Sequence, residues 1–527
     1  MTDARGVVQS RFLLLALTLG VLLVGVELMV TAVALPRMLA DLADWTQLRR
    51  ASWIINGYLV AYIAVMPLAG RAVDRYRVPG LFAFSLMVFA VGALLAGAAQ
   101  NLDWLIAARV VQGAGAGAIV PIATAGASQL FAGHARARAI GIVSGATFLG
   151  MAAGPFIGAT ILEAIQLPDA GLLGPSWRWI FYLAVPVAVL TALYAWAAAG
   201  WGMRPAGPRG ALDLPGAALF TAAVAAGLLA LTLVGEGDPW LVAGLAVGGA
   251  ASLALAVLRF TRAREPFIDL RFFADRTFSG AVLLSVLTGY AFATAIIGGA
   301  VFVDRVRYAG PDEQQLALGG LAVAVALGAL GSGFVLDRLG VRVPTLVGLG
   351  LAIGGLVALT TATPASDLAL LVAGMSTFGF GFGLTVTARS VAAIEALGRR
   401  AFGVAAGVVT VARMIGMAVG LAALTVLGSN RIEALSVVLV DQAARDAVLP
   451  PGLRGRPLED YLVVDALERW AATEAAGILA AVFLVAATVT AVAIVPTLAM
   501  RDLRRQQGAS HEGSDDAIAT APRAGSI

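Results

Sequence analysis

The chain has 527 residues, of which 60% are hydrophobic and 13% are charged, and its mean hydropathy is +0.89. In a soluble globular protein, roughly a quarter of the residues are charged. This composition therefore excludes a soluble globular protein and indicates a membrane protein. The absence of cysteine excludes disulfides, thiolate zinc sites and cysteine nucleophiles, and 2 histidines provide little for metal binding. The net charge of +4 is spread as arginine through short loops, which is not a nucleic-acid signal.

A helix needs about 20 apolar residues to cross a bilayer. Apolar stretches of that length predict an all-α polytopic membrane protein with a bundle of six spans in residues 1–200, two linking spans in 201–275 and a second bundle of six in 276–500. Residues 501–527 lack apolar periodicity, and we expect a disordered tail there. The predicted spans lie near 12–35, 52–70, 80–99, 103–127, 139–163, 178–199, 212–234, 240–260, 278–303, 314–336, 343–362, 366–388, 403–428 and 473–498.

The distribution of arginine predicts the orientation of the spans. Loops on the side of the N-terminus are much richer in arginine than the opposite loops, and such loops stay in the cytoplasm. With an even number of spans, both termini are then cytoplasmic. Arg5 and Arg11 precede the first apolar run as in a signal peptide, but the run is long and contains an acid, so we expect a retained helix.

The connection at 429–472 is long, and apolar residues recur in it at roughly helical spacing on both sides of Pro450-Pro451-Gly452. We therefore expect the spans at 403–428 and 473–498 to continue beyond the bilayer as an extracytoplasmic helical hairpin. A disordered loop is the alternative.

A Gly-x-x-x-Asp-Arg motif occurs twice, each time in a polar gap between two spans. The first copy consists of Gly70, Asp74 and Arg75, and the second of Gly333, Asp337 and Arg338. The repeat indicates a transporter with two related halves. We expect the aspartates to cap a helix or pair with arginine across a contact between the bundles that stabilises one access state. A tight turn with ordinary cytoplasmic charge would explain one copy but explains two poorly.

The two copies of this gating motif differ in the residues that follow them. The second continues to a turn glycine at Gly340, whereas the first has Arg77 at that place. Because a tight turn often requires positive φ, which favours glycine, we expect the first hairpin to turn differently, through Pro79-Gly80.

Glu27 lies near the middle of the first predicted span, where an unpaired carboxylate costs several kcal/mol. An intramembrane acid is by default a functional group, and a buried carboxyl can exchange protons near neutral pH. The alternative is a structural acid bonded to a neighbouring helix. Arg109 lies inside the fourth span, and we expect Glu27 to be its indirect partner. Arg413 is the comparable cation of the second half, and for both arginines a structural role near a helix end stays open.

The fifth span contains glycine at every fourth position, together with a proline. The motif consists of Gly150, Gly154, Pro155 and Gly158. Such spacing makes a flat packing face, and the proline removes a backbone donor, so the helix suits a bundle that rocks against another.

Together these motifs resemble the major facilitator superfamily, and within it the fourteen-span drug:proton antiporter branch, over about residues 12–500. The loop motif, the fifth-span motif and a fourth-span motif of Arg109, Gln112 and Gly113 all match. The resemblance implies two bundles that alternate access and are coupled to inward proton flow. It also implies that Glu27, Arg109 and Gln112 serve proton coupling.

The stretch 58–72 and the residues around Arg413 look like the mycobacterial lipid exporters that work with a periplasmic lipoprotein. Those relatives move triacylglycerides and related lipids, and their last helices project outside the membrane. This chain departs from the pattern at two positions. Glu27 stands where Asp is usual, and Phe148 stands where the lipid exporters carry an acid, for which Asp304 is only a weak replacement.

We therefore expect a multi-pass inner-membrane exporter of hydrophobic or amphipathic substrates, driven by proton antiport, and not an enzyme. Lipids such as triacylglycerides and amphipathic drugs fit equally, so multidrug efflux stays an alternative, as does solute:proton symport. A membrane enzyme would need a polar constellation in the spans, and a sensor would need a signalling module. The expected partners are the substrate, protons and a periplasmic lipoprotein; we expect a monomer with no cofactor, metal or nucleic acid.

Overall fold

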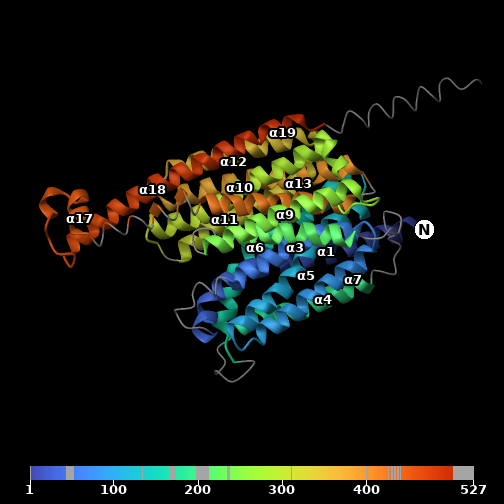
Figure 1. Cartoon of the computed structure of the whole chain (residues 1–527), viewed down its shortest axis with the longest axis horizontal. Helices are drawn as coiled ribbons and strands as arrows, with labels where there is room; N and C mark the ends of the chain where they lie inside the picture. The colour runs from blue at the N-terminus through green and yellow to red at the C-terminus, as the bar shows by residue number, and fades with distance from the viewer. Residues whose placement is uncertain are drawn as a thin grey trace, which may run out of the picture.

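The computed structural model is almost entirely helical (Figure 1). It describes residues 2–42, 53–132, 134–165, 174–197, 213–233, 238–309, 311–398, 401–424, 427–428, 431–432, 435, 438 and 441–501. These residues contain no strand, and 14 of their helices are long and apolar enough to cross a membrane. The predicted all-α polytopic fold with fourteen spans is confirmed.

The first half of the molecule is a bundle of long helices (Figure 1). Pro67, Pro121 and Pro155 lie inside three of them, and each helix continues through its proline. Because proline removes a backbone donor, each is a point at which a packed helix can bend. The helices are α1 (Thr2–Leu42), α3 (Trp53–Val73), α4 (Val78–Gly97), α5 (Leu102–Leu130), α6 (His134–Ala164) and α7 (Arg178–Ala197).

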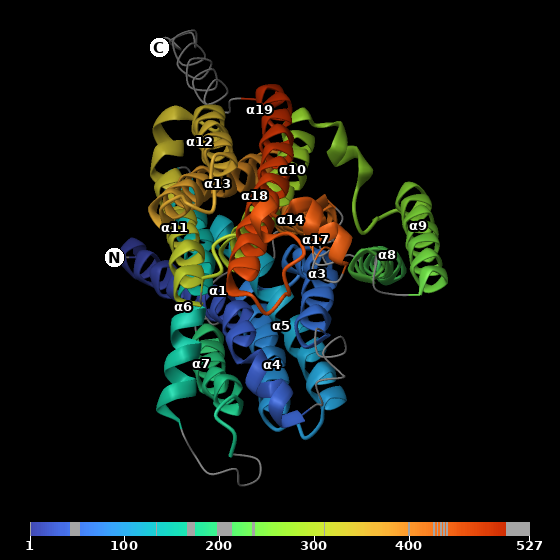
Figure 2. The ribbon, with the colours of Figure 1, turned by 90° about the vertical axis from the view of Figure 1, so that its left-hand side faces the viewer.

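The second half is a similar bundle, and a further pair of helices lies at the side of the molecule (Figure 2). The pair is α8 (Leu214–Leu233) and α9 (Pro239–Arg262), and α8 packs on α3 and α14, one helix from each half. The second half comprises α10 (Arg276–Arg305), α11 (Pro311–Leu339), α12 (Arg342–Thr360), α13 (Leu368–Leu397), α14 (Phe402–Leu424), α18 (Tyr461–Val492) and α19 (Ile494–Ala499), with the short helices η4 (Leu270–Ala274), α17 (Gln442–Val448) and η6 (Pro451–Leu453).

The glycines of the fifth-span motif hold α6 against α1. A Cβ at Gly150 would lie 2.2 Å from a backbone oxygen of α1, and one at Gly154 would lie 2.7 Å from another. A Cβ at Gly158 would lie 2.9 Å from the side chain of Val30, also on α1. Only glycine permits such an approach, so the predicted packing face is present and faces a helix of its own half.

The two halves touch closely at one end of the bundle. There, a Cβ at Gly403 of α14 would lie 1.9 Å from the carbonyl oxygen of Gly70 of α3. A Cβ at Gly333 of α11 would lie 2.9 Å from the carbonyl oxygen of Ala137 of α6. We call this the Asp74 end, because Asp74 directly follows α3. The start of α1 and the end of α19 also lie at this end (Figure 1).

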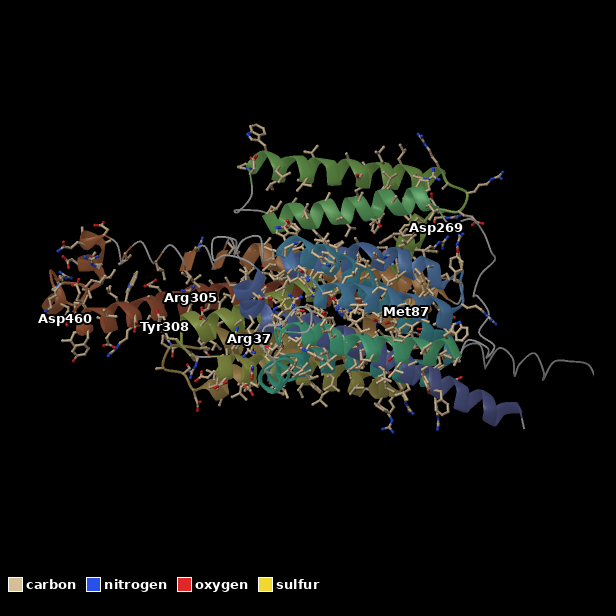
Figure 3. All side chains as sticks on the ribbon, turned by 90° about the horizontal axis from the view of Figure 1, so that it is seen from below. Arg37, Met87, Asp269, Arg305, Tyr308 and Asp460 are labelled. Carbon is tan, nitrogen blue, oxygen red and sulfur yellow. The ribbon has the colours of Figure 1, made fainter. Side chains whose placement is uncertain are left out.

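At the opposite end, which we call the hairpin end, α17 and the first turns of α18 project from the bundle (Figure 1). Leu449, Val463 and Leu467 form a small buried cluster there. Figure 3 shows Asp460 in this projection and Asp269 at the opposite end of the molecule. The helix α18 is continuous from the projection into the last span, but several residues of 429–440 lie outside the described chain. The extracytoplasmic location of the hairpin and the cytoplasmic location of the termini stay predictions, and the tail expected at 501–527 lies outside the described residues after Arg501.

Candidate functional site

A buried ion pair joins α1 and α5 inside the first half. Nη1 of Arg109 lies 3.0 Å from Oε1 of Glu27, and the two side chains are 1% and 2% exposed. The sequence analysis expected an indirect contact, but the contact is direct. Because both charges are withdrawn from water, each depends on the other for compensation, and protonation of Glu27 would remove the counter-ion of Arg109.

Other groups hold Arg109 in place around this pair. Its guanidinium also donates to Oε1 of Gln112 at 2.6 Å and to the carbonyl oxygen of Ile54 at 3.2 Å, and it lies 4.1 Å above the ring of Tyr58. The three residues grouped from the sequence, Glu27, Arg109 and Gln112, therefore do meet. These additional contacts are the ones that would remain if the bond to Glu27 broke.

Asp304 is not buried. Its side chain is 67% exposed near the end of α10, and its carboxylate pairs with the neighbouring Arg305 at 3.0 Å. Figure 3 shows Arg305 toward the hairpin end. Asp304 lacks the burial that singles out Glu27 as a candidate proton carrier.

Among its described residues, the second half contains two buried arginines rather than one. Arg413 of α14 lies 5.8 Å from the ring of Phe148, the residue that stands in place of an acid. Arg389 of α13 is 1% exposed, and its Nη1 donates to the hydroxyl of Thr288 of α10. Sequence reasoning missed Arg389 because it ended the span at 388, where an arginine reads as an ordinary cation at the membrane surface.

The first copy of the gating motif makes a contact between the halves. The carboxylate of Asp74 accepts hydrogen bonds from the backbone N–H of Gly403 at 2.7 Å and of Val404 at 3.0 Å, at the start of α14. Asp74 is therefore a helix cap supplied by the other half. Burial raises the pKa of its carboxyl to about 6, although these two hydrogen bonds and the positive charges of Arg71 and Arg75 act in the opposite direction.

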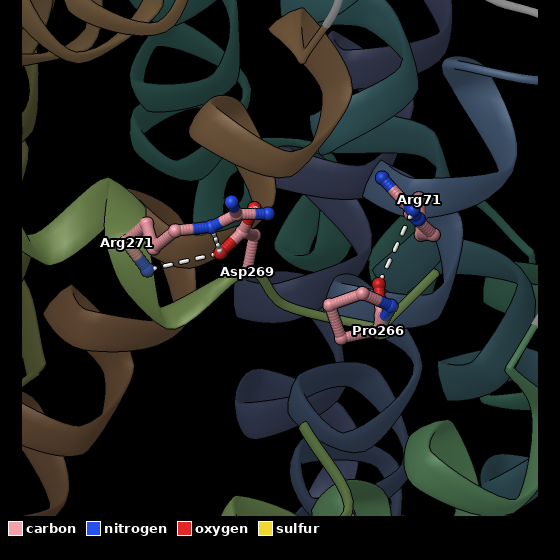
Figure 4. A network of polar contacts seen from close by, with 4 residues as sticks. All are labelled: Arg71, Pro266, Asp269 and Arg271. Carbon is pink, nitrogen blue, oxygen red and sulfur yellow. Dashed lines mark hydrogen bonds and ion pairs between the residues drawn. The ribbon is translucent and has the colours of Figure 1, made fainter. Parts of the chain in front are cut away.

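The arginines beside Asp74 connect this end to the segment before α10. Arg75 forms an ion pair of 2.9 Å with Glu265. Figure 4 shows Arg71, which donates to the carbonyl oxygen of Pro266 at 3.2 Å. In the same view Asp269 pairs with Arg271 at 3.0 Å, and the hydrogen bond from Arg271 lowers the pKa of that carboxyl. The segment around Glu265 thus lies against the gating motif.

The second copy of the motif is placed differently. Gly333 faces Ala137 of α6, so this copy also lies at a contact between the halves, and the side chain of Arg338 is exposed. The side chain of Asp337 lies outside the described residues. Gly340 has a φ of 71°, as expected for a turn glycine.

The first hairpin does turn differently, although not where the sequence suggested. Arg77 has an extended backbone with a φ of −68°, and it is the N-cap of α4. Pro79 and Gly80 lie inside the first turn of α4 rather than in the turn itself. The chain thus reverses over residues 74–77 without the positive φ that would have required glycine.

An apolar groove of about 570 Å³ separates α6 from α11 on the hairpin side of their contact. Leu149 and Phe156 line it from α6, Leu316 and Val323 line it from α11, and Ser376 is among its few polar residues. The same two helices touch near Ala137 and Gly333. The halves therefore meet at the Asp74 end and diverge toward the hairpin end.

Known sequences resemble this chain over most of its length. The family model of the Major Facilitator Superfamily matches residues 17–421. A triacylglyceride transporter of Mycolicibacterium hassiacum is 32% identical over 406 residues, which is 73% of each chain. One of Mycolicibacterium smegmatis is 30% identical and covers 83% of this chain and 79% of its own length. Multidrug resistance protein 3 of Bacillus subtilis is 26% identical, over 82% of each chain.

Solved structures share the same fold. The human organic anion transporter MFSD10 superimposes with a TM-score of 0.61 at 14% identity, over 93% of this chain and 99% of its own. A bacterial homologue of the human lysosomal transporter Spinster superimposes with a TM-score of 0.57 at 18% identity, over 94% and 98%. At such low identity these similarities show the fold alone. The family match and the transporter relatives show that the protein is a transporter and not an enzyme, and its 14 candidate spans make it a multi-pass protein of the cell membrane. The chain belongs to the major facilitator superfamily.

Proposed function

We propose that the protein exports hydrophobic or amphipathic substrates by proton antiport, with lipids such as triacylglycerides as the first candidate. The observation that carries the coupling is the buried pair of Glu27 and Arg109, because a carboxylate in the membrane interior needs either its counter-ion or a proton. The relatives named triacylglyceride transporters support the lipid candidate. Multidrug efflux is the second candidate, supported by relatives named multidrug transporters.

In this proposal, protonation of Glu27 breaks its bond to Arg109, and the guanidinium keeps its bonds to Gln112 and to the carbonyl oxygen of Ile54. The loss of this bond weakens the contact between α1 and α5 that the ion pair stabilises. Because α1 packs on α6, which in turn contacts α11 of the other half, the change can reach the contact between the halves.

Alternating access requires that the contacts at the Asp74 end break while others form at the hairpin end. The contacts that must break at the Asp74 end include those of Asp74, Gly70 and Gly403. The apolar groove between α6 and α11 suits a hydrophobic cargo, since its lining offers few hydrogen bonds to a polar one.

Purified protein in proteoliposomes tests the coupling. An inward-directed proton gradient should drive a labelled triacylglyceride or an amphipathic dye in the opposite direction, and a protonophore should stop it. Movement of substrate together with protons would instead establish symport. Transport that ignores the gradient would overturn the proposed coupling.

We also propose that the helical hairpin at the hairpin end hands lipid to a periplasmic lipoprotein. Deleting residues 432–468 should therefore impair lipid release several-fold more than dye efflux, because only a water-insoluble cargo needs an acceptor. Val463→Asp, which places a charge in the buried cluster between α17 and α18, should give a weaker form of the same defect. Tyr461→Asp is the matched control, since Tyr461 is 75% exposed on the same helix. Equal loss of lipid and dye transport, or loss of neither, would count against a lipid-specific role.

A further inference from the structure

Arg389 and Arg413 lie buried next to one another in the second half, on α13 and α14. Arg389 is 1% exposed and Arg413 is 9% exposed, and they are close enough to repel each other electrostatically. Nη2 of Arg389 and Nε of Arg413 have no hydrogen-bond partner among the described residues. Neither arginine forms an ion pair with a carboxylate in the described part of the chain.

The corresponding cation of the first half, Arg109, differs because its charge is compensated directly by the carboxylate of Glu27. Around the second-half pair, aromatic rings take the place of a carboxylate. The Cζ atom of Arg389 lies 5.2 Å from the ring of Phe382, and that of Arg413 lies 5.8 Å from the ring of Phe148. A cation–π contact recovers only part of the free energy lost when a guanidinium leaves water, so two positive charges remain undercompensated.

The arginine pair lies where the two halves meet. Phe148 comes from α6 and Tyr62, which interacts electrostatically with Arg413, comes from α3, both in the first half. Thr288, which accepts a hydrogen bond from Arg389, comes from α10 in the second half. A group bound between the halves would therefore reach both guanidiniums, and the surrounding residues would change as the halves move.

The rings beside the pair form one apolar cluster. Phe292 stacks on Phe382 with ring centroids 4.3 Å apart, and Phe148 meets the rings of Phe292 and Phe382 edge-on at 5.7 Å and 6.0 Å. Two cations directly beside an aromatic cluster match a ligand with an anionic head and an aliphatic body. Guanidinium groups bind carboxylate and phosphate particularly well, because their fork of donors fits two oxygens at once.

We propose that Arg389 and Arg413 bind the anionic head of an amphipathic substrate, a carboxylate or a phosphate, while the cluster of Phe148, Phe292 and Phe382 contacts its hydrocarbon chain. This inference rests on the proposed export of hydrophobic or amphipathic molecules and narrows their chemistry. It makes an anionic lipid a better cargo for this site than a neutral triacylglyceride. The anion also supplies the counter-charge that the described residues around the pair do not.

Equilibrium binding to purified full-length protein in nanodiscs of neutral lipid tests the site. The probes are labelled oleate, dioleoylphosphatidic acid and the neutral trioleoylglycerol. The wild type should bind at least one of the anionic probes, and Arg389→Gln/Arg413→Gln should weaken that binding by at least about tenfold while leaving trioleoylglycerol binding unchanged. The anion that responds identifies the head group as carboxylate or phosphate. Preference of the wild type for trioleoylglycerol, or equal binding of the anions by the double variant, would overturn the proposal.

Three further variants separate charge from folding. Arg389→Lys/Arg413→Lys keeps both charges and should retain more anion binding than the glutamine variant. Phe148→Glu places a carboxylate beside Arg413, so it should compete with the anion and weaken its binding. Arg262→Gln, at an exposed position at the end of α9, is the matched control and should bind like the wild type. Anion binding unaffected by Phe148→Glu would contradict the site, whereas failure of proton-driven transport would affect only the proposed coupling, since the binding assay has no gradient.

Discussion

Glu27→Gln should abolish proton-driven transport, reducing it to the rate of vesicles without protein. Glutamine has nearly the same shape and can still accept a hydrogen bond from Arg109, but it can neither carry a charge nor exchange a proton. Substrate movement after a proton gradient is imposed on proteoliposomes measures the effect. Exchange of labelled for unlabelled substrate needs no net proton movement, so it is the control and should continue. Normal gradient-driven transport by the variant would exclude Glu27 as the coupling group.

The same substitution should lower stability, because Arg109 would remain as a buried charge without a counter-ion. Breaking a buried pair in this way costs about 3–5 kcal/mol. The double variant Glu27→Gln/Arg109→Gln removes both charges and should recover much of the melting temperature while still failing to couple transport to protons. This pattern would separate a loss of coupling from a loss of folding. A double variant as unstable as the single one would show that Arg109 has structural roles beyond the pair.

Much of the fold could be predicted because bilayer thickness converts length and hydropathy directly into spans. The sequence singles out Glu27 and Arg109 for the same reason, since a charge deep within an apolar stretch is conspicuous. Their direct contact could not be predicted. It depends on how α1 and α5 are placed side by side, and the spacing of 82 residues between the two side chains carries no such information.

Arg389 shows a different limit of the sequence. The span predicted from hydropathy ends at residue 388 and so leaves Arg389 out, whereas α13 runs on to Leu397. Its neighbours are Thr288 on α10 and Arg413 on α14, which only the packing of helices brings close to it. The sequence also could not predict the partner of Asp74, because that partner is the backbone N–H of Gly403 rather than a charged side chain.

The Asp74 contact should make closure of the Asp74 end depend on pH. In the closed state burial raises the pKa of Asp74 to about 6, against an ordinary value of 3.8, which it should regain when the end opens to water. The closed state then holds the proton more tightly. Proton binding at Asp74 therefore stabilises the closed state relative to the open state. This stabilisation is fully present below the ordinary pKa of 3.8 and is lost as pH rises through about 6. Between about pH 5 and about pH 7, the ratio of closed to open molecules should fall about tenfold.

Spin labels at Tyr76→Cys and Leu339→Cys can measure this ratio, because both positions are exposed at the Asp74 end of different halves and the chain has no other cysteine. The long-distance population should grow as pH rises over that range. Arg71, Arg75, Glu265 and Asp269 face the same region, and these two further acids are paired with Arg75 and Arg271. Glu395, which pairs with Arg136 of the other half, is the remaining acid to test, by Glu395→Gln. Asp74→Asn should therefore remove the pH dependence, whereas Glu265→Gln should preserve it. An unchanged pH response in Asp74→Asn would assign the titration to another group.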